Sequence, residues 1–205
     1  MTSRYLHQLF TPSVKAAQQA QGSRQAYARA DAPTSEADRL TPREEMFISM
    51  RDSFYMATNS ASGWPYLQHR GGPVGFVKIL DGGRLGFADF RGNRQYVSLG
   101  NIAHDDRASL FFMDYVRRAR LKVLGRIRSI DLADRPALAA MLIDENYGAK
   151  VERGLVVEID SFNWNCPQHI TRRYAENELD ALVKPLQERI AELEATLRRL
   201  SRADA

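Results

Sequence analysis

The sequence predicts a mainly β protein with flanking helices, folded as a small barrel of six to seven antiparallel strands. Short runs rich in β-branched and aromatic residues recur through the middle of the chain, and few helical segments separate them. The segment 119–130 alternates apolar and polar residues, which is typical of a half-buried antiparallel strand. We expect these strands to close into a barrel, because closure removes the exposed edges of the sheet.

The expected strands follow from local patterns and are bounded by turn residues. We predict them at 54–58, 65–70, 75–80, 84–89, 108–113, 119–130 and 155–160. Asp81-Gly82-Gly83 forms the turn of one hairpin, and Arg117 and Arg118 are expected in a solvated turn of another. Short helices are predicted at 95–103 and 133–143.

Three segments are expected along the chain: an arm and linker at 1–40, the barrel domain at 41–174 and a helix within 175–205. In the arm, Thr11-Pro12 starts a helix that continues over 14–29, and 30–40 is a loop. The arm has few large apolar residues, so we expect it to lie on the barrel or on a partner subunit.

The barrel domain is expected to open with a helix that ends near Arg51. Thr41 and Glu44 have the spacing of a capping box at its start. Met46, Phe47 and Met50 are expected to share one side of this helix.

The C-terminal helix, predicted over 176–200, is amphipathic. Its apolar residues recur at steps of three and four: Leu182, Leu186, Ile190, Leu193, Leu197 and Leu200. From Ile190 onward the stripe resembles a heptad pattern of less than two heptads. The stripe could pack on its own domain or contact a second subunit, and the sequence does not distinguish these two arrangements.

Composition excludes several classes of protein. The 205 residues are 44% hydrophobic and 26% charged with a net charge of +4, and no apolar run reaches the ~20 residues of a membrane span. The N-terminus lacks the apolar stretch of a secretion signal, so we expect a cytoplasmic protein. The basic residues do not cluster with exposed aromatics, which argues against nucleic-acid binding.

Cysteine and histidine usage offers no metal site and no disulfide. Cys166 is the one cysteine of the chain, and none of the four histidines has metal-ligand spacing with another ligand. We expect Cys166 to be structural, because no histidine–acid pairing accompanies it.

Two basic, glycine-bearing segments predict a site for a phosphate-bearing ligand. The first is His69-Arg70-Gly71-Gly72-Pro73, at the end of a predicted strand. The second, 87–101, reads FADFRGNRQYVSLGN and joins a strand to a short helix. Arginine supplies paired donors, and backbone N–H groups at a helix start point at an anion.

On these two segments the sequence, from Thr41 to Arg173, resembles the pyridoxamine 5′-phosphate oxidase-like flavoproteins. The resemblance implies a split β-barrel that binds FMN at the interface of a homodimer. It implies an oxidoreductase that acts on an unidentified small molecule, with NADPH or NADH as a candidate electron donor. No residue is predicted as a general acid or base, so the catalytic residues are unknown.

The resemblance also implies residue roles. The cofactor-binding set is His69, Arg70, Gly71, Val77, Lys78, Asp89, Asn93, Arg94, Gln95, Ser98, Arg120, Trp164, Gln168, His169 and Arg172. Within this set, Asn93-Arg94-Gln95 stands where the family has a Ser-Arg-Lys phosphate clamp. Trp164 or Gln168, together with Arg172, would reach FMN across the dimer interface.

The chain departs from the family pattern at two positions. Pro73 stands where the family has the arginine that opens its first clamp, and His69 and Arg70 are the possible substitutes. Gln95 replaces the lysine of the second clamp, which removes one positive charge.

Other functions remain open on the same fold. Pyridoxamine 5′-phosphate oxidase activity itself is less favoured, because the family's C-terminal ending differs from Ile170-Thr171-Arg172-Arg173. The alternative to an enzyme is a non-catalytic carrier or sensor of flavin, deazaflavin or haem. His69 or His169 would then be the axial ligand of a haem.

Overall fold

The computed structural model describes residues 3–31, 36–164 and 167–203. The chain forms two compact units. The first comprises Met1–Asp114 with Ala119–Pro167, and the second comprises Tyr115–Arg118 with Gln168–Ala205.

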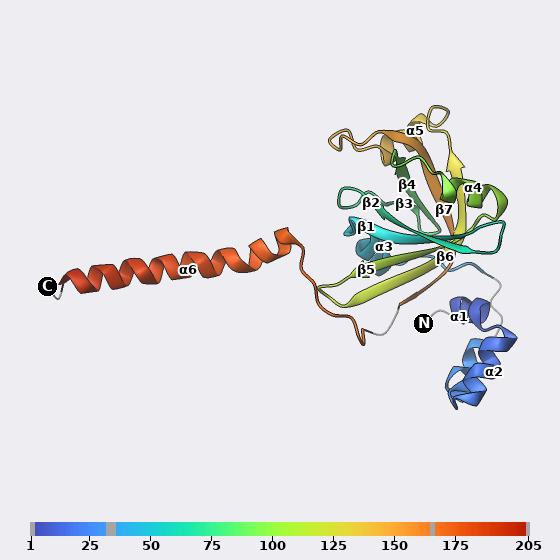
Figure 1. Cartoon of the computed structure of the whole chain (residues 1–205), viewed down its shortest axis with the longest axis horizontal. Coiled ribbons are helices and arrows are strands. Elements are labelled where there is room, and N and C mark those ends of the chain that lie inside the picture. The colour runs from blue at the N-terminus through green and yellow to red at the C-terminus, as the bar shows by residue number, and fades with distance from the viewer. Residues whose placement is uncertain (1–2, 32–35, 165–166, 204–205) are drawn as a thin grey trace. The chain divides into compact units, whose positions relative to one another are not determined.

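Seven strands form one antiparallel sheet in the first unit (Figure 1). They are β1 (Ser53–Asn59), β2 (Pro65–Gly71), β3 (Lys78–Asp81), β4 (Arg84–Phe90), β5 (Arg107–Asp114), β6 (Ala119–Ile130) and β7 (Val151–Trp164). Their order in the sheet is β2-β1-β5-β6-β7-β4-β3, and every neighbouring pair is antiparallel.

The sheet curls around one hydrophobic core. Phe54 of β1 lies 5.1 Å from Phe87 of β4, centroid to centroid, although three strands separate β1 from β4 in the sheet. Phe54 also stacks on Phe112 of β5 at 5.0 Å, and all three rings are buried. Contact between such distant strands requires a rolled sheet, so the predicted antiparallel split barrel is confirmed.

Two strands differ in length from the prediction. The strand expected from Gly75 begins only at Lys78, because Gly75 takes a left-handed φ of 78° in the turn that precedes β3. The strand expected over 155–160 is β7, which extends over fourteen residues and carries Trp164 at its end. The pairing of β6 with β7 contains a bulge at Gly125. A Cβ added at Gly125 would lie 2.5 Å from the carbonyl oxygen of Glu158.

Helix α3 (Pro42–Ser49) begins at the predicted capping box. The Glu44 carboxylate accepts hydrogen bonds from the backbone N–H of Thr41 at 3.1 Å and from its hydroxyl at 2.5 Å. The side chains around this helix differ in their exposure. Ile48 is fully buried, whereas Met46 and Met50 are 65% and 43% exposed.

The N-terminal arm folds into α1 (Ser3–Leu9), α2 (Pro12–Ala20) and the 3₁₀ helix η1 (Arg24–Asp31). The predicted start at Thr11 is confirmed, since its hydroxyl accepts from the N–H of Val14. The prediction of one continuous helix over 14–29 was wrong, because Gly22 takes a positive φ of 72° and ends α2.

Helix α1 contacts β7. Arg4 pairs with Asp160, and Ser161 donates a hydrogen bond to the Gln8 side chain at 2.5 Å. Tyr5 is buried beside Lys122, whose Nζ lies 5.2 Å from the ring centroid. Burial raises the pKa of Tyr5, and burial followed by the nearby Arg120 charge lowers the pKa of Lys122.

The remaining helices are α4 (Val97–His104), α5 (Pro136–Leu142) and, in the second unit, α6 (Glu176–Ala203). Helix α5 starts later than predicted, with Pro136 in its first turn. The predicted C-terminal helix is present in full as α6. Among the described residues, no helix is both long enough and apolar enough to span a membrane.

Candidate functional site: a polar cavity between β2 and α4

A polar cavity of about 250 Å³ lies where β2, the end of β4 and the start of α4 meet; we call it the β2–α4 cavity. It is lined by Tyr66, Gln68, Arg70, Asp89, Phe90, Gly92, Asn93, Arg94, Gln95, Tyr96, Val97, Ser98, Leu99 and Glu152. Both glycine-bearing segments of the sequence therefore reach the same cavity.

Strand β2 forms one wall through side chains two residues apart. Tyr66, Gln68 and Arg70 share a face because side chains alternate along a strand. Gln68 accepts a hydrogen bond from the Ser98 hydroxyl at 2.8 Å, which joins β2 to the first turn of α4.

A chain of ion pairs forms the floor of the cavity. Arg70 Nη1 lies 2.5 Å from Asp89 Oδ1, and both side chains are largely buried. Arg153 lies 3.6 Å from the other Asp89 oxygen and 3.1 Å from Glu152. Glu152 is also 3.3 Å from Arg91. Both carboxylates are thus compensated by arginines, which outnumber them.

One donor in this floor has no partner. The Nε atom of Arg70 is buried and makes no hydrogen bond within the described part of the chain. A buried polar group without a partner costs about 1–3 kcal/mol, so it points to a ligand or to water at this place.

The loop from Arg91 to Tyr96 has unusual backbone geometry. Arg94 and Tyr96, neither of them glycine, have left-handed φ values of 62° and 52°. Each such residue costs about 1–3 kcal/mol and persists only where other interactions hold it. Strained residues cluster at functional sites, and both of these line the cavity.

Arg94 is held through one edge of its guanidinium. Its Nε donates to the Tyr96 hydroxyl at 3.3 Å, and that hydroxyl donates to Glu152 at 3.1 Å. The contact with Tyr96 raises the pKa of Arg94. The two terminal nitrogens of Arg94 have no partner among residues 3–31, 36–164 and 167–203, so they are available to an anion.

The first turn of α4 adds backbone donors. Val97, Ser98 and Leu99 line the cavity, and no side chain of the described residues caps this helix. The N–H groups of a first helical turn have no partner within the helix, and the helix dipole favours a negative charge there. Together with Arg70 and Arg94 they make the cavity suited to bind a phosphate group.

Six of the predicted cofactor-binding residues line this cavity: Arg70, Asp89, Asn93, Arg94, Gln95 and Ser98. Four others do not. His69 is on the other face of β2, where its ring packs edge-on against Tyr55 at 5.6 Å. Gly71 ends β2, Val77 is buried in the core and Lys78 begins β3.

Trp164 belongs to a different contact. Its indole N–H donates to Glu44 at 2.5 Å, and its ring packs against Phe47 at 4.7 Å and under Arg43 at 4.5 Å. Hydrogen bonds from Thr41 and Trp164 lower the pKa of Glu44, although burial acts in the opposite direction. We call these residues, Thr41, Arg43, Glu44, Phe47 and Trp164, the Glu44 corner.

The remaining predicted residues lie elsewhere. Arg120 is near the start of β6. Gln168, His169 and Arg172 belong to the second unit, and their roles stay predictions. Cys166 lies outside the described residues.

Four polar residues that line the cavity were not predicted: Tyr66, Gln68, Tyr96 and Glu152. Tyr66 and Gln68 could have been found, because they precede Arg70 by four and two residues on one strand. Glu152 could not, because it reaches the cavity through the pairing of β7 with β4, where Arg153 lies opposite Asp89.

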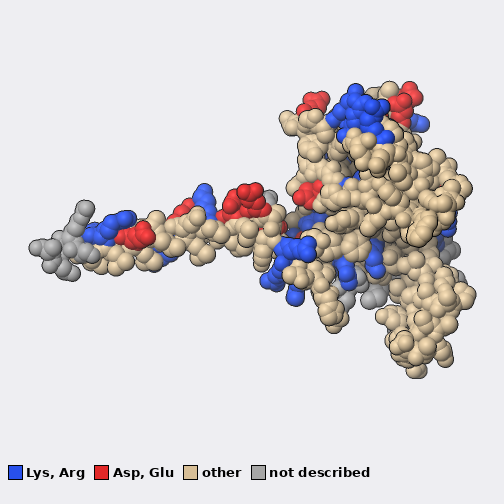
Figure 2. All heavy atoms as spheres, in the orientation of Figure 1, with Lys and Arg blue, Asp and Glu red and all other residues tan. Residues whose placement is uncertain are grey.

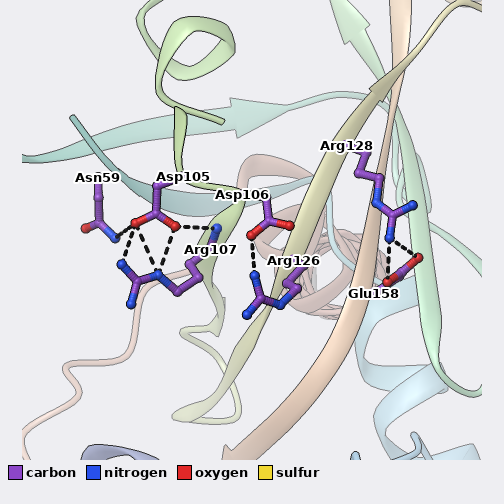
Figure 3. A network of polar contacts seen from close by, with 7 residues as sticks. All are labelled: Asn59, Asp105, Asp106, Arg107, Arg126, Arg128 and Glu158. Carbon is purple, nitrogen blue, oxygen red and sulfur yellow. Dashed lines mark hydrogen bonds and ion pairs between the residues drawn. The ribbon is translucent and has the colours of Figure 1, made fainter. Parts of the chain in front are cut away.

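A second charged region lies on the outer face of the barrel and is internally compensated (Figure 3). Arg107 pairs with Asp105 at 2.6 Å, Arg126 with Asp106 at 2.5 Å and Arg128 with Glu158 at 3.0 Å. Hydrogen bonds from Arg107 hold the pKa of Asp105 well below its usual range. Because each of these arginines has an acidic partner, this region is less suited to an anion than the β2–α4 cavity.

Comparison with known proteins identifies a family. A family model described as pyridoxamine 5′-phosphate oxidase matches residues 40–173. No curated protein matches the sequence significantly.

Several solved structures are similar at low sequence identity. HupZ from Group A Streptococcus is 12% identical, with 66% of this chain and 99% of that chain covered and a TM-score of 0.47. A Clostridium acetobutylicum protein related to general stress protein 26, of the pyridoxinephosphate oxidase family, is 14% identical, with 66% and 94% covered and a TM-score of 0.47. An FMN-binding protein from Syntrophomonas wolfei is 10% identical, with 72% and 97% covered and a TM-score of 0.44.

Proposed function

Because the chain belongs to the pyridoxamine 5′-phosphate oxidase family, we propose that it is a flavoprotein that binds FMN with the phosphate in the β2–α4 cavity. The observation that carries the proposal is the buried Nε of Arg70, which has no partner within the described residues and belongs to a side chain that lines this cavity. A phosphate oxygen is an acceptor that would satisfy it through a charge-assisted hydrogen bond.

The other donors fit the same ligand. The terminal nitrogens of Arg94 and the first-turn N–H groups of α4 belong to residues that line one cavity. Their number suits the three acceptor oxygens of a phosphate group. The αL conformation of Arg94 is then explained as the backbone geometry that presents this side chain to the ligand.

The size of the cavity supports a shared site. Pockets that enclose a drug-sized ligand have volumes of about 300–1,000 Å³. The β2–α4 cavity, at about 250 Å³, is smaller than this range, and we propose that it holds the phosphate end of FMN. We therefore propose a homodimer in which the second subunit covers the ring, with Gln168, His169 and Arg172 as the candidate contacts.

The proposed activity is that of an oxidoreductase acting on a small molecule. Bound FMN would supply the electron-transfer chemistry, and the protein would bind and orient it. The two carboxylates of the cavity, Asp89 and Glu152, are each held by arginines, so their role here is to position those arginines. NADPH and NADH are the first electron donors to test.

The test is the absorption spectrum of the purified full chain, recorded before and after incubation with FMN and removal of the excess. Stoichiometric bound flavin is the expected result, and steady-state assays with NADPH and NADH then follow. A Soret band in place of flavin absorption would assign the barrel to haem, and no retained chromophore would contradict the proposal.

A further inference from the structure

Helix α6 carries a complete heptad pattern over three heptads. Counting d positions every seven residues gives Leu179, Leu186, Leu193 and Leu200. The a positions between them are Val183, Ile190 and Leu197. Steps of four and three alternate without interruption, which is longer than the stretch from Ile190 alone.

All seven side chains are exposed within the second unit. Their exposed fractions range from 41% at Val183 to 64% at Leu186. Acidic and basic side chains both occur along the rest of the helix (Figure 2). An apolar stripe of this length on a charged helix is typical of an interface with another helix.

The residue types at the a and d positions favour a coiled coil of two parallel helices. All four d positions are leucine, and two of the three a positions, Val183 and Ile190, are β-branched. β-Branched residues at a with leucine at d favour parallel dimers over higher oligomers.

The flanking charges select the same orientation. Among the g positions the charged residue is Arg189, and among the e positions the charged residues are Asp180 and Glu194. Parallel helices bring g of one chain beside e of the other, so Arg189 meets the partner's Glu194 twice by symmetry. Antiparallel helices bring g beside g and e beside e, which offers no attractive pair in any alignment.

Two features of the single helix are compatible with this pairing. Pro185 occupies a c position, outside the apolar stripe. Arg189 pairs with Glu192 at 2.6 Å on the exposed surface, a contact that is worth little and can be exchanged.

We propose that α6 forms a parallel two-stranded coiled coil with α6 of a second copy of this chain. The two chains are then related by a two-fold axis along the coil, the closed symmetry of a homodimer. The residues of this interface are not among the proposed flavin contacts, so the chain would be joined at α6 whether or not FMN is bound.

Disulfide trapping in the full chain tests the pairing and its direction. In a Cys166→Ser background, Leu200→Cys places a thiol at the last d position, where a parallel pair brings the two thiols together. We expect a self-crosslinked dimer after mild oxidation, with a yield at least about tenfold above that of the matched Ala195→Cys control at an outward f position. Adding Leu186→Lys and Leu193→Lys to the Leu200→Cys chain is expected to abolish the crosslink.

Two results would overturn the proposal. Equal yields of crosslinked dimer from Leu200→Cys and Ala195→Cys would show that the helices do not pair through the a and d positions. A disulfide between a Leu179→Cys chain and a Leu200→Cys chain, without self-crosslinking of either, would show an antiparallel pair. Flavin content is measured on the same samples, so a failed crosslink in a flavin-loaded protein counts against the coiled coil alone.

Discussion

Two polar regions of the barrel, the Glu44 corner and the β2–α4 cavity, differ in whether their buried polar groups have hydrogen-bond partners. At the corner, the Glu44 carboxylate accepts from the Thr41 backbone, the Thr41 hydroxyl and the Trp164 indole. At the cavity, Arg70 has a buried nitrogen without a partner among the described residues. The loop beside it holds two non-glycine residues at positive φ.

The difference separates a structural contact from a binding site. A satisfied buried group stabilises the fold and needs nothing further. Unsatisfied donors and backbone strain cost free energy, which the rest of the fold has to offset. We therefore expect substitutions at the corner to change stability, and substitutions of the cavity donors to change ligand affinity.

The largest expected effect is on stability, at the ion pair under the cavity. Arg70→Ala leaves Asp89 largely buried, with Arg153, at 3.6 Å, as its remaining ion-pair partner among the described residues. Breaking a buried pair in this way costs about 3–5 kcal/mol, which urea unfolding would measure. Arg70→Lys is the matched control: it keeps the positive charge and removes the unpaired Nε, so it should retain most of the stability and still lose phosphate affinity.

Trp164→Phe tests the corner. It keeps an aromatic ring against Phe47 and removes the donor to Glu44, so we expect a loss of about 1–3 kcal/mol in the free energy of unfolding. Flavin affinity should stay unchanged if the corner is structural. A variant of normal stability that no longer retains flavin would instead make Trp164 a cofactor contact.

Arg94→Asn tests the loop. Asparagine tolerates the left-handed conformation at this position, so the loop should keep its shape while the guanidinium is lost. Loss of a charge-assisted contact of about 1.5–3 kcal/mol predicts a Kd for FMN raised roughly 10- to 150-fold. Thermal unfolding should occur at the same temperature or higher, and a destabilised protein with normal affinity would refute the assignment.

The smallest expected effect is a dependence on pH at the corner. The pKa of Glu44 is lowered in the folded protein, so its contribution to stability is present above the ordinary glutamate pKa and is lost as pH falls through the folded value. Unfolding free energies measured from about pH 6 to about pH 3 should therefore fall more steeply for the wild type than for Glu44→Gln. Parallel curves would contradict the assignment of this pH dependence to Glu44.

The strands and the approximate site could be predicted because their signals are local. Alternation marks β6, and the two glycine-bearing segments mark the cavity. Arg70, Arg94 and Ser98 were predicted together for this reason. Gln68 was missed although the two-residue period contains it.

The rest depends on contacts that the sequence does not display. The αL geometry of Arg94 and Tyr96 is set by their surroundings, since neither residue type favours it. Glu152 joins the cavity only because β7 starts four residues earlier than its pattern indicates and pairs with β4. The hydrogen bond from Trp164 to Glu44 likewise joins residues that are 120 positions apart in the sequence.

The most direct test of the account compares FMN with riboflavin, which lacks only the phosphate, in equilibrium titrations of the full chain. If the β2–α4 cavity holds the phosphate, FMN should bind at least about tenfold more tightly than riboflavin, and Arg94→Asn and Arg70→Lys should reduce that ratio toward one. Equal affinities for FMN and riboflavin in the wild type would contradict the account.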